Sequence, residues 1–150
     1  RNVGLSLMKP FTEILDEMES DNKFGQNNLE MEIQRCLDLT IKYMRYHRQY
    51  KESLVAMWGA YNQSELSKQE YYAGRSLSEE YMKKPFNVEV KNNIEMKRWI
   101  EGDPELVAMT KVIKLTEDSL EKIQGMLDSL KYRPNHIQTI LEIRKWDAGV

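Results

Sequence analysis

Basic side chains and tyrosines are interleaved through the middle of this 150-residue sequence, and the two kinds of side chain together suit one chemistry. Cations neutralise phosphates and flat rings stack on bases, which is what binding of single-stranded nucleic acid without sequence preference requires. The basic residues are Lys42, Arg45, Arg48, Lys51, Lys68, Arg75, Lys83 and Lys84. The tyrosines among them are Tyr43, Tyr46, Tyr50, Tyr61, Tyr71, Tyr72 and Tyr81. The alternative is a solvated helix face with tyrosines packed inside a bundle, and composition alone favours it.

Charge is unevenly distributed, although the net charge is only −2. Between Phe11 and Glu32 seven acidic residues stand against one basic residue, Lys23. Basic residues outnumber acidic ones from Thr40 to Arg75 and again from Lys83 to Arg98. The distribution of charge therefore bears on nucleic-acid binding, whereas the total charge does not.

Residue sets that carry catalysis or hold a metal are not recognisable. The two histidines, His47 and His136, lie far apart, and with the single cysteine Cys36 they give no zinc-binding spacing. Glycine-rich phosphate loops of the GxxxxGKS or GxGxxG kind do not occur. The sequence therefore predicts a protein that is not an enzyme and that uses no cofactor or metal.

Length and composition predict one helical domain over residues 1–150. The longest apolar runs are too short to cross a bilayer, and the amino end lacks a secretory pattern, although the chain opens at Arg1 and not at Met. A single cysteine suits a reducing cytosol, and Cys36, between Ile33 and Leu37, is expected to be a buried core thiol.

Two helices are expected in the first half of the chain. An acidic helix falls within residues 1–24, and Gly25 ends it. A very long basic and aromatic helix covers residues 28–73, opens after Asn27 and ends at Gly74. The apolar series expected to pack is Leu29, Ile33, Leu37, Ile41, Met44, His47, Leu54, Met57, Tyr61 and Leu66.

After Gly74 the pattern changes. Pro85 forbids helix continuation, and residues 86–90 alternate apolar and polar, which predicts at most a short β element. Asp103-Pro104-Glu105 is then a helix start, with an N-cap acceptor followed by proline at the first helical position.

The region 104–147 carries two heptad series, interrupted by Thr116 as the only polar member, and Pro134 is expected to divide it into a helical hairpin. The heptad residues are Leu106, Met109, Ile113, Leu120, Ile123, Leu127 and Leu130. Two interpretations stay open. The series either packs inside the hairpin or forms a subunit interface.

Several short motifs occur in an order that resembles the UvsY family of recombination mediators from T-even and related bacteriophages. They are EYYAGR at residues 70–75, Pro85-Phe86, WIEGDPEL at residues 99–106, Arg133 with His136-Ile137-Gln138, and WDAG at residues 146–149. The resemblance is best over residues 65–150, weaker over 29–64 and absent before that. The most specific part of the resemblance is the combination of EYYAGR, read as acidic-Tyr-Tyr-small-Gly-basic, with the final WDAG, read as aromatic-acidic-Ala-Gly.

The resemblance implies a mainly α protein that forms a homo-oligomeric ring, reported as a heptamer, and lacks enzymatic activity. Such proteins bind single-stranded DNA and help a RecA-like recombinase to replace the single-strand-binding protein. A phage-encoded protein of this kind is expected in the host cytoplasm. The alternative is a helical scaffold or adaptor that acts only through protein contacts.

The family's DNA-binding motif has two basic positions just before the Tyr-Tyr pair. In this sequence Leu66 stands at the first position and Lys68 at the second. The implied DNA contact at Lys68, Tyr71, Tyr72 and Arg75 is therefore either weaker or displaced. Lys83 and Lys84, or the residues from Lys42 to Lys51, are the alternatives.

Overall fold

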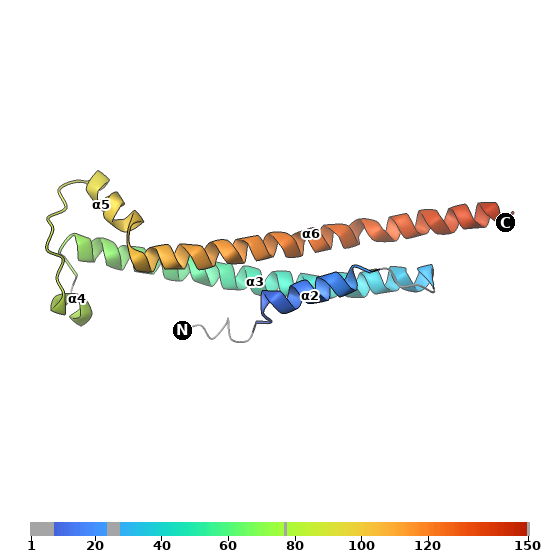
Figure 1. The fold of residues 1–150 in the computed structure, drawn as a ribbon, viewed down its shortest axis with the longest axis horizontal. Coiled ribbons are helices and arrows are strands. Elements are labelled where there is room, and N and C mark those ends of the chain that lie inside the picture. Colours follow the sequence, from blue (N-terminus) through green and yellow to red (C-terminus); the bar gives the residue numbers. More distant parts are fainter. Residues whose placement is uncertain (1–7, 24–27, 77, 150) are drawn as a thin grey trace. The chain divides into compact units, whose positions relative to one another are not determined.

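The computed structural model describes residues 8–23, 28–76 and 78–149, and within them it has five helices and no strand (Figure 1). The helices are α2 (Phe11–Asp21), α3 (Leu29–Tyr72), α4 (Glu79–Lys83), α5 (Asn93–Glu101) and α6 (Pro104–Asp147). The prediction of a mainly α fold with long helices is confirmed. Of the region 1–24 expected to hold the acidic helix, residues 1–7 and 24 lie outside the described residues.

Both ends of α3 follow from local sequence. At its start the Asn28 side chain accepts hydrogen bonds from the backbone N–H groups of Glu30, at 2.9 Å, and Met31, at 3.4 Å. At its end Gly74 adopts a φ of 74°, and the N–H groups of Gly74 and Arg75 bond to the carbonyls of Tyr71 and Glu70. That pairing is a Schellman motif, which requires a left-handed residue and therefore favours glycine.

The face of α3 that packs inside the chain differs from the predicted one. Leu37, Ile41 and Met44 are exposed, and the positions buried in their place include Cys36, Leu39 and Tyr43. These residues form two apolar series on neighbouring faces of the same helix. The apolar pattern alone does not show which of the two series packs against the rest of the chain.

The helix α6 runs from Pro104 to Asp147 without a break, so the predicted hairpin is wrong. Pro134 lies inside the helix, where it lacks the N–H that would bond to Leu130 and costs roughly 3 kcal/mol. Buried neighbours on the same face offset this cost. Leu130 and Ile137 belong to the hydrophobic core, and the Arg133 side chain bonds to Asn22.

The strand considered for residues 86–90 is absent. No neighbouring strand is available among the described residues, and a short strand without a partner is not stable. Phe86 instead packs its ring against those of Tyr72 and Trp99, with ring centroids 4.8 Å apart in both pairs.

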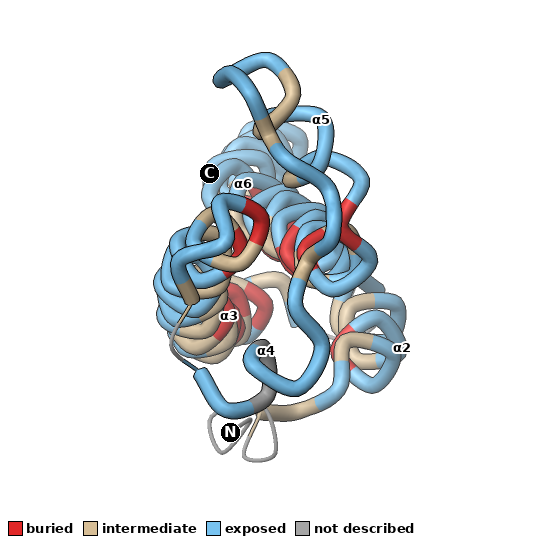
Figure 2. The backbone as a smooth tube through the Cα atoms, turned by 90° about the vertical axis from the view of Figure 1, so that its left-hand side faces the viewer, coloured by how far each residue is buried: buried red, intermediate tan, exposed pale blue. Residues whose placement is uncertain are grey.

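Where the sequence predicts one domain, the chain packs as two compact units. The first, here called unit 1, comprises Arg1–Ser53 and Asp118–Val150, and unit 2 comprises Leu54–Glu117. The core of unit 1 draws on α2, α3 and α6, and its buried positions are among those coloured red in Figure 2. Its members are Ile14, Cys36, Leu39, Tyr43, Tyr50, Ile123, Met126, Leu130 and Ile137.

The heptad series of α6 is buried inside the subunit. Ile123 and Leu130 lie in the core of unit 1, and Leu120 and Leu127 pack against that core. In unit 2 Leu106, Ile113 and Thr116 are buried and Met109 is half-buried. A second copy would therefore have to meet a surface other than the heptad series, which the sequence offered as a possible subunit interface for oligomerisation. None of the described helices has an apolar stretch long enough to cross a bilayer.

Candidate nucleic-acid interface

The predicted DNA-binding residues of unit 2 divide into buried and exposed ones. Lys68 is only 8% exposed, and its ammonium lies 3.3 Å from Oδ2 of Asp103 and 3.3 Å from Oε2 of Glu105. Tyr72 is also 8% exposed and donates its hydroxyl hydrogen to the same Oδ2 at 2.6 Å. Neither side chain is presented to a ligand. Both positions expected to bind DNA are instead part of an internal contact.

Asp103 is the acceptor at the centre of this contact. It is 2% exposed, and its second oxygen, Oδ1, accepts the backbone N–H of Leu106 at 3.0 Å and thereby caps α6. Burial alone would raise the pKa of Asp103. The hydrogen bonds from Tyr72 and Leu106 and the charge of Lys68 outweigh burial and hold the pKa below its usual value.

Four rings gather around this contact and join three segments of unit 2. Trp99 of α5 stacks on Tyr72 of α3, with centroids 5.8 Å apart and planes inclined by 28°. Tyr71 and Phe86 complete the cluster, at 5.3 Å between Tyr71 and Tyr72 and 5.6 Å between Tyr71 and Phe86. We call Tyr71, Tyr72, Phe86 and Trp99 the ring cluster. Sequence reasoning named the two tyrosines as binding residues and did not include Phe86 or Trp99 among them.

The remaining predicted residues of unit 2, Arg75, Lys83 and Lys84, are exposed. None of their charged groups makes an ion pair with a described residue. They are free to meet phosphates, whereas Lys68 is not.

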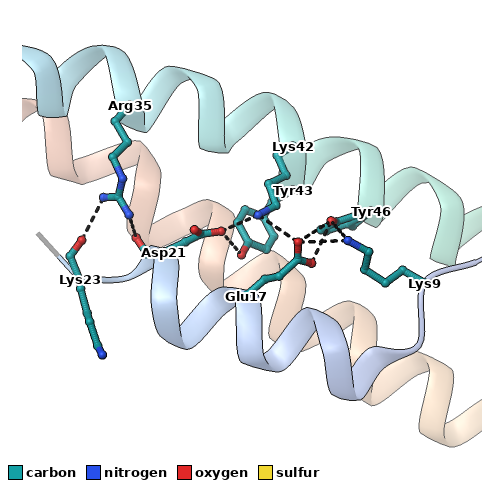
Figure 3. Close-up of polar contacts among 8 residues, drawn as sticks. All are labelled: Lys9, Glu17, Asp21, Lys23, Arg35, Lys42, Tyr43 and Tyr46. Atoms are coloured by element: carbon teal, nitrogen blue, oxygen red, sulfur yellow. Dashed lines mark hydrogen bonds and ion pairs between the residues drawn. The ribbon is translucent and has the colours of Figure 1, made fainter. Parts of the chain in front are cut away.

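In unit 1 the predicted residue Lys42 is already held by α2 (Figure 3). Its ammonium lies 2.7 Å from Oδ2 of Asp21 and 3.2 Å from Oε1 of Glu17. Tyr43 donates its hydroxyl hydrogen to the same Asp21 oxygen at 2.8 Å. Burial opposes the charged form of Lys42, but both carboxylates outweigh burial and raise the pKa of the ammonium. The acidic α2 thus neutralises part of the basic track on α3.

Further polar contacts fasten α2 along α3. The Tyr46 hydroxyl lies 2.9 Å from Oε2 of Glu17, and Lys9 donates to Tyr46 at 2.9 Å and to Glu17 at 3.1 Å (Figure 3). At the other end of α2, Arg35 donates to the carbonyl oxygens of Asp21, at 2.7 Å, and Lys23, at 2.9 Å. The Asp21 carbonyl belongs to the last turn of α2 and that of Lys23 lies just beyond it, where intrahelical donors are lacking.

Three predicted residues of unit 1 differ from Lys42 in their surroundings. Arg45, Arg48 and Lys51 are exposed and make no ion pair or hydrogen bond through their charged groups with any described residue. Spaced three residues apart on α3, they form a short basic row that we call the α3 row. It is the part of the predicted basic track in unit 1 that remains available to a polyanion.

Side chains that bind metals do not gather in the described parts of the chain. No three His, Cys, Asp or Glu residues there are placed to share an ion. Cys36 is buried, and burial raises the pKa of its thiol, so its sulfur is packed as the sequence predicts.

Comparison with known proteins identifies the family. The model of the family described as "Recombination, repair and ssDNA binding protein UvsY" matches residues 17–150. The chain belongs to the UvsY family. Its members are recombination, repair and single-strand-binding proteins, and the resemblance noted in the sequence is confirmed.

Solved structures share the fold. Two crystal structures of the recombination mediator protein UvsY of bacteriophage T4 superpose with TM-scores of 0.80 and 0.81 at 19% identity. The matches cover 92% and 93% of this chain and 99% and 98% of the T4 chain. At this identity they show a common fold alone. No curated protein sequence matches the chain.

Three of the five motifs that carry the family resemblance lie in unit 2 and meet there. The pair Tyr71-Tyr72, Phe86, and Trp99 with Asp103 come from three stretches of sequence and meet in the ring cluster and its buried ion pair. Much of the UvsY signature in this chain is therefore a packing arrangement. The basic residues that could meet a ligand lie outside the signature, except Arg75.

Proposed function

We propose that the protein is a recombination mediator that binds single-stranded DNA and helps a RecA-like recombinase to replace the single-strand-binding protein. In this proposal it catalyses no reaction itself. Membership of the UvsY family carries the proposal, since the family model extends over both units and both groups of exposed basic residues. We expect it to act in the cytoplasm of a phage-infected host.

The α3 row gives this proposal a physical basis. Cations without partners can release the counterions that condense on a nucleic-acid strand, whereas Lys42 and Lys68 would first have to give up carboxylates. Arg75, Lys83 and Lys84 offer further phosphate contacts in unit 2. A few such contacts per subunit give weak binding, so a useful mediator needs several linked subunits.

Self-association is the second part of the proposal. Unit 1 exposes one apolar strip on α3, formed by Leu37, Ile41 and Met44, and another on α6, formed by Ile140, Ile143 and Trp146. We propose that a second copy of the chain is the occupant, with the α3 strip of one subunit packed on the α6 strip of the next. A head-to-tail contact of this kind closes into a ring when the rotation between subunits allows it. Linkage of weak sites in a ring raises avidity by roughly 10²–10⁴.

Sedimentation of an Ile41→Glu variant tests the self-association, because a charge buried at this contact is costly. The variant should lose mass relative to the wild type and keep its helical circular dichroism, which shows that the subunit still folds. Leu115→Glu, which also charges an exposed apolar position but in unit 2, is the control and should assemble normally. A wild-type protein that sediments as a monomer at micromolar concentration would exclude the ring.

A salt series of binding to a labelled oligothymidine tests the DNA-binding proposal. Replacing Arg45 and Arg48 by alanine should weaken binding and flatten the plot of log K against log salt by about 0.7 for each phosphate that is no longer neutralised. The control replaces Lys111 and Lys114, which are equally exposed and carry the same total charge. If the wild type does not bind the oligonucleotide at low salt, the adaptor function that acts only through protein contacts is the better description.

The loading step needs its own measurement. On an oligonucleotide saturated with single-strand-binding protein, a RecA-like recombinase should assemble faster when this protein is present. The Arg45→Ala, Arg48→Ala double variant should lose the acceleration. Binding without acceleration would reduce the function to that of a single-strand-binding protein.

A further inference from the structure

The helix α5 is unusual in that none of its nine residues is buried. Most helical stability in proteins comes from burial of an apolar face, so a helix without a fully buried residue needs further support. At its start the Asn92 side chain accepts the N–H of Glu95 at 2.9 Å, and the Glu95 carboxylate accepts the N–H of Lys91 at 2.9 Å. These two hydrogen bonds and the rings of Trp99 and its neighbours fix α5 in unit 2.

Trp99 is at once fixed and accessible. Its indole stacks on Tyr72, whose hydroxyl is bonded to buried Asp103, and the Phe86 ring meets it edge-on at 4.8 Å and 79°. In spite of these contacts Trp99 is 38% exposed. A large ring whose rotamer is already set loses little conformational entropy when a ligand stacks on it.

Two basic residues directly precede this ring on α5, which also carries Glu95 and Glu101. Arg98 precedes it and is exposed, with no ion pair to a described residue. Lys97 pairs with Glu101 at 3.8 Å, but both side chains are largely exposed, and such pairs are weak and easily exchanged. From Lys83 to Arg98 five basic residues stand against two acidic ones, Glu89 and Glu95, which leaves an excess of positive charge.

We propose that Trp99 is a base-stacking platform for single-stranded nucleic acid, with Arg98 and Arg75 placed to meet the adjoining phosphates. The inference rests on the proposed function and assigns the base contact within it. It moves that contact from Tyr72, whose ring and hydroxyl are both engaged inside unit 2, to the exposed ring stacked on Tyr72. A stacked ring with nearby cations suits a strand of nucleic acid better than a protein partner, since every base has a face and every nucleotide a phosphate.

Tryptophan fluorescence tests the proposal directly, because a base stacked on an indole quenches its emission. The chain has three tryptophans, so Trp58→Phe with Trp146→Phe leaves Trp99 as the only tryptophan, which is excited selectively at long wavelength, and sedimentation checks that this variant still assembles. Titration with an oligothymidine should quench this protein. An abasic oligonucleotide of the same length should bind through its phosphates without quenching. The matched control retains Trp146 alone, in a Trp58→Phe, Trp99→Phe protein, and should not be quenched.

Affinity supplies a second arm. Trp99→Ala should weaken binding of the oligothymidine about 5- to 150-fold for each base stacked, at an unchanged salt slope. Trp99→Phe retains a ring and should recover most of the affinity. Thermal unfolding of both variants identifies any loss that comes from disruption of the ring cluster.

The outcomes separate the two proposals. If the wild type binds no oligonucleotide, the proposed function fails and this inference fails with it. If the oligonucleotide binds but Trp99 emission is unchanged and Trp99→Ala keeps its affinity, the inference alone is wrong. Trp99 would then be a packing residue or part of a surface for a protein.

Discussion

The same three-residue contact occurs in both units of the molecule. In unit 1 Lys42 and Tyr43 share Oδ2 of Asp21, and in unit 2 Lys68 and Tyr72 share Oδ2 of Asp103. We call each of them a lysine–tyrosine–aspartate contact. Each contact joins α3 to an element distant in sequence, which is α2 in unit 1 and the start of α6 in unit 2.

The two contacts differ in burial. The Asp21 and Lys42 side chains are 20% and 32% exposed, whereas those of Asp103 and Lys68 are 2% and 10% exposed. Water can take the place of a lost partner in unit 1, but hardly in unit 2. Because an unpaired buried charge is costly, the same chemistry should be worth much more in the second setting. The comparison also shows that a lysine within a basic stretch of sequence can pair with carboxylates of its own chain. The two lysines differ in how deeply that pair is buried.

The largest effect is expected from Asp103→Asn. The substitution retains an oxygen to cap α6 but leaves Lys68 buried without its main counter-charge, which should cost about 3 kcal/mol or more. Urea unfolding measures the loss. Glu105→Gln is the control, because Glu105 also pairs with Lys68 but is 69% exposed and should contribute no more than about 1 kcal/mol. Equal losses in the two variants would mean that burial does not distinguish these pairs.

Asp21→Asn makes the matching change in unit 1 and should cost less. Lys42 keeps Glu17 at 3.2 Å, and water reaches the site, so the loss should be about 1–2 kcal/mol. Asp16→Asn, an exposed position on the same helix, should change the free energy of unfolding by less than about 0.5 kcal/mol. A loss as large as that in Asp103→Asn would remove the distinction between the units.

The dependence of stability on pH should reflect both contacts. Burial alone would raise the pKa values of Glu17, Asp21 and Asp103, but bonds from lysine and tyrosine outweigh burial and lower all three. A carboxyl whose folded pKa is depressed stabilises the fold above its unfolded pKa, about 4, and this stabilisation is lost as pH falls through the folded pKa. Titration of these three carboxyls should therefore leave the free energy of unfolding nearly constant above about pH 5. Below that pH the free energy of unfolding should fall towards pH 3.

Urea unfolding from pH 7 to pH 3 measures this effect. Asp21→Asn and Asp103→Asn should each show a smaller fall than the wild type, because each lacks one of the depressed carboxyls. If a variant loses as much free energy of unfolding between pH 7 and pH 3 as the wild type, the aspartate that it replaces has the same pKa in the folded and unfolded wild-type chains.

The sequence was most informative where the cause of a structure is local. The ends of α3 and the start of α6 follow from Asn28, Gly74 and Asp103-Pro104, whose effects act within one turn. The prediction at Pro134 was wrong for the complementary reason. The helix stability lost at a proline is a local effect and can be read from the sequence. The packing of Leu130 and Ile137, which offsets that loss, depends on residues distant in the sequence.

The candidate site was harder to predict because a lysine in sequence does not reveal its counter-ion. Lys68 and Asp103 are 35 positions apart, and nothing near Lys68 indicates that they meet. Arg48 has the same apparent character in the sequence, yet its guanidinium pairs with none of the described residues. Leu37, Ile41 and Met44 were likewise expected to pack but are exposed, because periodicity identifies an apolar face and not the surface that it meets.

The smallest effect in the comparison is expected when DNA binding of the two lysines is tested. Both ammonium groups already have carboxylate partners, so Lys68→Met and Lys42→Met should leave the salt slope of oligothymidine binding nearly unchanged. Arg48→Ala, at a free cation of the α3 row, should flatten the slope by about 0.7 for each subunit engaged. Lys42 is the more exposed of the two lysines, so any residual change should appear there first. Unfolding by urea should report the opposite order, with the greater loss in Lys68→Met. A slope change in Lys68→Met as large as that in Arg48→Ala would mean that DNA displaces Asp103 from the buried contact, and the assignment of Lys68 to the interior would be wrong.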